Sequence, residues 1–129
     1  MEFQVSALIP ATAEEIFDAW LDSRGHSEMT GSSAKASSEP NANFDAWDGY
    51  IRGRNVLLER PTRIVQSWRT SNFDASDPDS QIEVMLEPKN GDTQVTIHHT
   101  RLPAHGSRYE TGWPEHYFEP MRSYFSQSK

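Results

Sequence analysis

The chain has 129 residues, and its 19 acidic side chains against 12 basic ones give a net charge of −7. This balance argues against non-specific nucleic-acid binding, which needs clustered positive charge, and the absence of Cys excludes disulfides, thiol nucleophiles and zinc–thiolate sites. No apolar run approaches the ~20 residues of a membrane span, and residues 1–10 lack the features of a signal peptide. The composition therefore predicts one cytoplasmic domain over residues 1–129, long enough to bury a core.

The N-terminal part is predicted to be a strand followed by a helix. Residues 2–9 alternate between apolar and polar side chains, as in a half-buried strand, and Pro10 ends the pattern. Thr12 and Glu15 have the spacing of a capping box. Apolar side chains then recur at helical spacing, which predicts a short amphipathic helix over residues 13–22.

Residues 23–42 are rich in Ser, Gly and Asn and carry few apolar side chains. We expect one short helix near residues 26–29 and one edge strand near residues 34–38. The rest of the segment is predicted to be loop, either a lid or plain surface.

The segment FDAWDGYIRG, residues 44–53, predicts a β-hairpin around Asp48-Gly49, which is typical of a two-residue type I′ turn. Residues that are paired across the two strands share a face of the sheet. Gly53 would leave room for the Phe44 ring beside it. The turn predicts four pairs: Trp47 with Tyr50, Ala46 with Ile51, Asp45 with Arg52, and Phe44 with Gly53.

Further strands follow the hairpin. Residues 63–70 come after a turn at Pro61-Thr62, an acidic loop covers residues 71–80, and residues 81–88 and 93–100 alternate on either side of a second turn. Two amides fall on the inward, apolar phase of this sheet. They are Asn55 and Gln66, on the phase that also carries Ile51, Leu57, Ile64 and Trp68.

The C-terminal part is predicted to be helical, with Pro114 in the first turn and the main helix over residues 113–127. Pro120 lacks an N–H group and should kink this helix. A stripe of large side chains marks its buried face: Tyr109, Trp113, Tyr117, Met121, Tyr124 and Phe125. The order of elements predicts an α+β fold, in which a curved antiparallel sheet of about six strands wraps around a long C-terminal helix.

Three stretches carry a resemblance to a known family: WDGYIRGRNVLLERPTRIVQSWR, TQVTIHHTRLP and GWPEHYFEPMRSYF. Their order and spacing resemble the helix-grip, START-like (SRPBCC) superfamily, in the branch named for the activator of heat-shock protein 90 ATPase homologue. The resemblance covers residues 2 to about 126 and is weakest from residue 26 to residue 43. It implies a hydrophobic cavity between sheet and helix. Members of the superfamily bind lipids, sterols or aromatic polyketides, act as cyclases or aromatases, or serve as co-chaperones in the stress response.

The inward phase and the resemblance together predict a ligand cavity with apolar walls and a few polar groups. The alternative is a filled core in which the buried polar groups bond to one another or to buried water. The predicted ligand-binding residues are Phe44, Ile51, Asn55, Leu57, Gln66, Trp68, Val84, Val95, Ile97, His99, Trp113, Tyr117 and Met121.

No metal site, cofactor or catalytic residue is predicted. His98 and His99 are adjacent on a strand and so point to opposite faces, and the other histidines lack ligand-like spacing. His99 beside Glu59 or Tyr117 is the candidate for a general base. No nucleophile triad can be assembled around it. A polyketide cyclase-like enzyme, which the resemblance implies, is kept as an alternative.

A chaperone surface is a further alternative, built from the outward pairs Trp47/Tyr50 and Asp45/Arg52 with Val56 and Leu58. These residues would otherwise pack across strands, under the N-terminal helix or in a homodimer. In the family, the co-chaperone role belongs to a two-domain protein. The interpretation that we favour is a non-enzymatic domain whose partner is a small hydrophobic or aromatic molecule, without membrane insertion.

Overall fold

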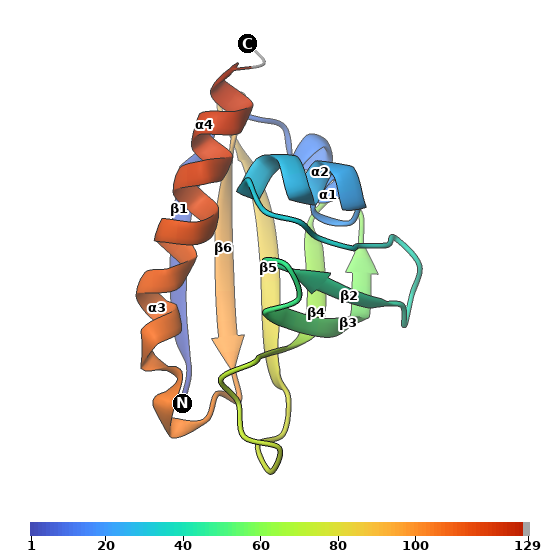
Figure 1. Ribbon diagram of the computed structural model, residues 1–129. Coiled ribbons are helices and arrows are strands. Elements are labelled where there is room, and N and C mark those ends of the chain that lie inside the picture. Colours follow the sequence, from blue (N-terminus) through green and yellow to red (C-terminus); the bar gives the residue numbers. More distant parts are fainter. Residues whose placement is uncertain (128–129) are drawn as a thin grey trace.

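The computed structural model describes residues 1–127 and contains one antiparallel sheet of six strands in the order β1-β6-β5-β4-β3-β2 (Figure 1). Neighbouring strands are antiparallel throughout. The predicted α+β helix-grip fold is confirmed. The strands are β1 (Phe3–Ile9), β2 (Asn43–Ala46), β3 (Ile51–Glu59), β4 (Arg63–Thr70), β5 (Ser80–Lys89) and β6 (Asp92–Thr100).

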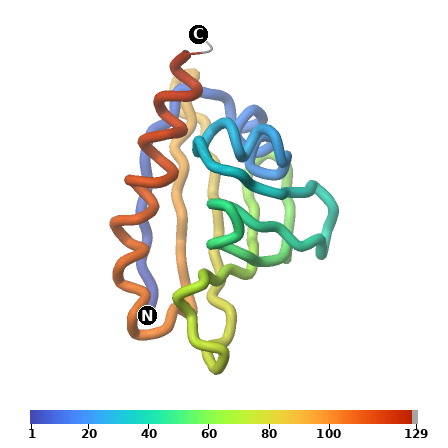
Figure 2. Tube along the Cα trace, viewed as in Figure 1, coloured from blue at the N-terminus to red at the C-terminus, as the bar shows by residue number. Residues whose placement is uncertain are grey.

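The helices pack on one face of this sheet. The C-terminal helical segments run along β1 and β6, while α1 and α2 cover one end, and the tube trace shows the same arrangement (Figures 1 and 2). No helix among residues 1–127 is long and apolar enough to span a membrane. The helical elements are α1 (Ala13–Trp20), α2 (Ser23–Thr30), a 3₁₀ turn (Ala104–Ser107), α3 (Arg108–Trp113), a π-helical turn (Pro114–Phe118) and α4 (Glu119–Gln127).

Both N-terminal helices begin at side-chain caps. The Thr12 hydroxyl accepts from the Glu15 N–H at 3.1 Å, and the Glu15 carboxylate accepts from the Thr12 N–H at 2.9 Å, so the predicted capping box is present. Asp22 caps α2 by accepting from the Gly25 N–H at 2.8 Å. This cap starts α2 at residue 23, three residues earlier than predicted.

The edge strand predicted near residues 34–38 is reduced to one bridge between Lys35 and Asp45. Serine side chains of α2 bind the backbone that a strand would use. The Ala34 N–H donates to Ser27 Oγ and the Ala36 N–H to Ser23 Oγ, both at 2.9 Å. Hydroxyl groups therefore replace a β-ladder along this segment.

The predicted hairpin register is confirmed for Ala46 with Ile51, Asp45 with Arg52 and Phe44 with Gly53. Its turn closes with a Tyr50 N–H bond to the Trp47 carbonyl at 3.1 Å, and Asp48 and Gly49 have φ values of 56° and 86°, as a type I′ turn requires. A Cβ on Gly53 would lie 2.6 Å from Cε1 of Phe44, so the glycine leaves room for that ring.

A β-bulge in β3 corrects one prediction. The register pairs Asn55 with Gln66 but Leu57 with Val65, so one extra residue is inserted between these pairs. Leu57 is therefore 39 % exposed on the outer face instead of facing the helices. Leu58 takes the inward phase opposite Ile64 and packs against the core.

The C-terminal helix begins at Arg108 instead of Trp113, and its irregularity lies just before Pro120. In the π-helical turn the Glu119 N–H bonds to the Pro114 carbonyl, five residues back. A regular α-turn would bring the Pro120 ring against the carbonyl four residues before it. The wider turn places the consecutive residues Tyr117 and Phe118 in the interior, 3 % and 2 % exposed.

Candidate functional site

A cavity of about 370 Å³ lies between the sheet and the C-terminal helix. The β2–β3 turn, the start of β3, the end of β4 that pairs with it, and two turns of helix form its walls. Seven of its nine lining residues carry rings. The lining consists of Trp47, Tyr50, Ile51, Trp68, Tyr109, Gly112, Trp113, His116 and Tyr117.

Neighbouring rings in the lining are edge-on or tilted to one another and do not stack in parallel. Trp68 meets Tyr109 edge-on, at 4.9 Å between centroids and 81° between planes, and Trp113 is tilted at 49° to Tyr117. Gly112 adds open space from the helix side, because a Cβ there would meet only His116 Cδ2, at 3.9 Å. Large tilted rings beside a residue without a side chain account for the cavity.

Four of the thirteen predicted ligand residues line this cavity: Ile51, Trp68, Trp113 and Tyr117. The structure adds five that the prediction did not include. Tyr109 was on the predicted helical stripe, and that stripe could have identified it. The other four are Trp47, Tyr50, Gly112 and His116.

Trp47 and Tyr50 were predicted to face outward as a cross-strand pair, and this placement is corrected. They flank the type I′ turn, and Trp47 has a φ of 53°, so its backbone is not that of a strand residue. The strict alternation of faces therefore ends at Ala46. The turn places both residues in the cavity lining.

The two inward amides lie outside the cavity lining, in a hydrogen-bond chain that crosses the core. The Trp20 indole N–H donates to Gln66 Oε1 at 3.2 Å, and Gln66 Nε2 donates to Asn55 Oδ1 at 2.9 Å. Asn55 Nδ2 then donates to the carbonyls of Ser37 and Glu39, at 2.8 and 2.9 Å. The chain ties α1 to β4, β3 and the polar segment before β2.

His99 is fully buried behind Trp113 and is held neutral. The Trp113 indole N–H donates to His99 Nδ1 at 3.1 Å, so the proton sits on Nε2 and is donated to Ser80 Oγ at 3.0 Å. Ser80 Oγ in turn donates to the Trp68 carbonyl at 2.6 Å. Burial lowers the pKa of His99 to about 3.

His26, to which the sequence analysis assigned no role, holds Tyr117 in place. Its Nδ1 donates to the Trp20 carbonyl at 2.8 Å, which leaves Nε2 to accept from the Tyr117 hydroxyl at 2.8 Å. Burial lowers the pKa of His26 and raises that of Tyr117, so both are neutral. The helix wall is thus anchored from behind at Trp113 and at Tyr117.

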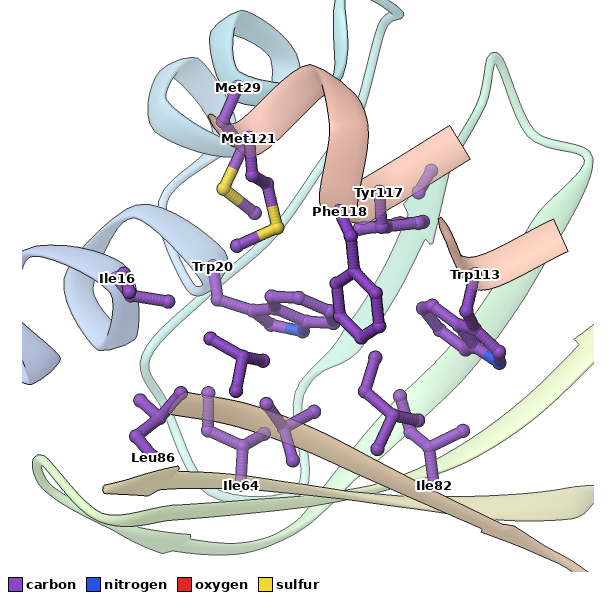
Figure 3. Close-up of a cluster of buried hydrophobic side chains, with 14 of the residues drawn as sticks. Ile16, Trp20, Met29, Ile64, Ile82, Leu86, Trp113, Tyr117, Phe118 and Met121 are labelled. Carbon is purple, nitrogen blue, oxygen red and sulfur yellow. The ribbon is translucent and has the colours of Figure 1, made fainter. Parts of the chain in front are cut away.

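The other predicted residues lie in the core. Figure 3 shows Met121 and Phe118 on the helix side of a cluster, with Trp20 between them and Ile64, Ile82 and Leu86 of the sheet. These side chains fill the space under α1 and α4. Val84, Val95, Ile97 and Met121 are all fully buried and absent from the cavity lining.

A second groove, of about 580 Å³, lies over the outer face of β2, β3 and β4 and is bordered by Phe44 and charged residues. Several of those charges are paired. Arg69 donates to Asp79 at 2.8 Å, and Arg54 donates to Asn41 at 3.0 Å. Elsewhere on this face His98 bonds to Glu2 at 2.8 Å, opposite in direction to the inward His99 as predicted. Among residues 1–127 no group of three or more His, Asp or Glu is arranged to hold a metal.

The sequence model of the family described as "Activator of Hsp90 ATPase homolog 1-like protein" matches residues 10–126. The chain belongs to this family. No curated protein matches it.

Several solved structures share the fold at low sequence identity. An HSP90 activator from Plasmodium falciparum is 21 % identical, with a TM-score of 0.82 and coverage of 92 % of this chain and 91 % of that one. CalU16 from Micromonospora echinospora is 21 % identical, with a TM-score of 0.77 over 97 % and 76 % of the two chains. The Aha1 dimer from Colwellia psychrerythraea is 14 % identical, with a TM-score of 0.78 over 94 % and 93 %. At these identities the likeness establishes the fold alone.

Proposed function

We propose that this protein binds a small, uncharged aromatic molecule in the cavity between the β2–β3 turn and the C-terminal helix. The observation that carries the proposal is the cavity itself, about 370 Å³ in volume and walled by seven rings. Small-molecule sites commonly have volumes of about 300–1,000 Å³ and mostly apolar walls. A flat aromatic ligand would meet these rings face-on or edge-on, both of which are favourable geometries for aromatic pairs.

The lining chemistry supports a neutral ligand. None of the nine lining residues is Asp, Glu, Lys or Arg. A charged ligand would lose its hydration on entry without gaining an ion pair, which is strongly unfavourable. The net charge of −7 further disfavours an anion.

The buried histidines support binding over acid–base chemistry. His99 uses both ring nitrogens, toward Trp113 and Ser80, and His26 uses both toward Trp20 and Tyr117. A general base needs a free nitrogen that can reach the substrate. We therefore assign these residues to positioning the wall.

The decisive experiment blocks the cavity at Gly112. A Leu there has room at Cβ, since only His116 Cδ2 lies within 4 Å, and its side chain would extend into the cavity. Gly112→Ala is the matched control, because it makes the same change in helix propensity, worth about 0.5–1 kcal/mol of stability, but leaves most of the cavity open. Binding is measured by equilibrium dialysis against 2-ethylnaphthalene and 2-acetylnaphthalene and by the shift in Tm that each produces.

We expect the wild type and Gly112→Ala to bind at least one probe, and Gly112→Leu to bind it about tenfold or more weakly because its side chain occupies the cavity. Circular dichroism checks that all three variants are folded. No binding of either probe to the wild type, or equal binding to Gly112→Leu and Gly112→Ala, would overturn the proposal.

A further inference from the structure

The four indole N–H groups of the chain divide into two kinds. Those of Trp20 and Trp113 donate to Gln66 and His99, at 3.2 and 3.1 Å. Among the described residues 1–127, the N–H of Trp47 is buried without a partner, whereas the N–H of Trp68 has no hydrogen-bond partner in the chain but is not fully buried. Both of the indoles without a partner line the cavity.

An indole N–H can only donate, so it needs an acceptor. The Trp68 side chain is 3 % exposed and packs against other rings, but its indole nitrogen keeps contact with solvent, unlike the fully covered nitrogen of Trp47. Buried donors in folded proteins almost always have partners. The buried, unpartnered N–H of Trp47 therefore indicates an acceptor that enters from outside the chain, and the N–H of Trp68 is a second donor in the lining of the same cavity.

The Trp47 indole can become accessible to a ligand. The His116 ring lies against it, edge-on at 5.2 Å between centroids and 70° between planes. The His116 side chain is 59 % exposed, and the carboxylate of the adjacent Glu115 lies 3.9 Å from it. Rotation of this exposed ring toward solvent would uncover the N–H without disturbing the core.

We infer that the ligand of this cavity is a planar aromatic molecule that carries a neutral hydrogen-bond acceptor, a carbonyl group, which the indole N–H groups of Trp47 and Trp68 bind. The inference rests on the proposed function and specifies its ligand class. The aromatic body would lie among Tyr109, Trp113 and Tyr117, and the carbonyl would face the two donors.

The test uses two probes of nearly equal shape, 2-acetylnaphthalene and 2-ethylnaphthalene, which differ by a carbonyl in place of a methylene. Their dissociation constants are measured for the wild type and for Trp47→Phe, which keeps an aromatic ring but removes the N–H. The wild type should bind the ketone about 3- to 10-fold more tightly than the hydrocarbon, the effect of one net hydrogen bond. Trp47→Phe should reduce this ratio to about one or two.

Tyr124→Phe is the control for losing a polar hydrogen from an aromatic ring, because its hydroxyl donates to Glu28 outside the cavity. It should keep the wild-type ratio. Trp68→Phe tests the second donor, and benzothienylalanine at position 47, which replaces N–H by sulfur, gives a shape-conserving variant if Trp47→Phe does not fold.

The outcomes separate the two proposals. Binding of both probes with the same ratio in the wild type and in the variants at positions 47 and 68 would overturn the acceptor inference and leave the proposed function standing. No binding of either probe to the wild type would overturn both.

Discussion

The two ends of the space between the sheet and the helices differ in how their buried polar groups are paired. Toward α1, polar groups are buried but connected, in the chain from Trp20 through Gln66 and Asn55 to the carbonyls of Ser37 and Glu39. Toward α3, the rings leave a cavity, and the indole N–H of Trp47 in its lining is buried without a partner among residues 1–127. Hydrogen-bonded polar groups fill the first region, and the second contains a buried donor without a partner.

The difference shows how a buried polar residue should be interpreted. A buried amide whose donors and acceptor are all occupied by the chain specifies packing, since a half-satisfied amide would be unstable. A buried donor without a partner indicates a ligand or water. Residue type alone does not distinguish these cases, whereas the hydrogen bonds do.

The largest expected effect comes from breaking the amide chain. Gln66→Met keeps the length of the side chain but leaves the Trp20 N–H and Asn55 Oδ1 unpaired in a region without a cavity. We expect a loss of about 2–4 kcal/mol in the free energy of unfolding, measured by urea denaturation. Gln4→Met, at an exposed position on the outer face of β1, is the matched control. A loss no greater than that of the control would show that the chain does not stabilise the fold.

The next effect is a dependence of stability on pH through His99. Its folded pKa of about 3 lies below the ordinary histidine pKa of 6.5, so the unfolded chain binds the extra proton and acid favours unfolding. This stability is present above pH 6.5 and is lost as the pH falls toward 3. Between pH 7.5 and pH 5 the free energy of unfolding should fall by about 2 kcal/mol through His99.

The variant His99→Gln tests this prediction by removing the titrating group. Its free energy of unfolding should fall less steeply with decreasing pH than that of the wild type. The difference in slope should correspond to nearly one fewer proton taken up on unfolding. His98→Gln, on the other face of β6, is the control for losing an imidazole. Equal slopes for His99→Gln and the wild type would contradict the prediction. His26 contributes in the same direction, because burial lowers its pKa as well.

The smallest effect is expected at the edge of the cavity. Thr70 Oγ1 lies 2.6 Å from the Tyr109 hydroxyl and also accepts from the Asn72 N–H at 3.2 Å. Thr70→Val should cost about 1–2 kcal/mol, less than Gln66→Met, because the released hydroxyl of Tyr109 can bond to water in the cavity that it lines. Paired denaturation curves of the two variants make the comparison, and a greater loss for Thr70→Val would reverse it.

The sequence by itself determined the order of elements, the capping box at Thr12, the type I′ turn at Asp48-Gly49 and the register that follows from it. These features depend on residues close together in the sequence and on the two-residue repeat of side chains along a strand, so they can be identified from the sequence. The same periodicity identified Ile51, Trp68, Trp113 and Tyr117 as inward residues, and these four line the cavity.

Only the tertiary structure decided which inward residues border open space. Alternation gives the face of a strand but not what lies opposite, so Gln66 in the core and Trp68 at the cavity look alike in sequence. The bulge after Asn55 and the π-helical turn before Pro120 shift faces by one residue, because they relieve backbone constraints that involve neighbouring strands or turns. Trp47 lines the cavity because its backbone, with a φ of 53°, is not that of a strand residue. Its lack of a hydrogen-bond partner depends on the positions of all its neighbours, which the sequence does not give.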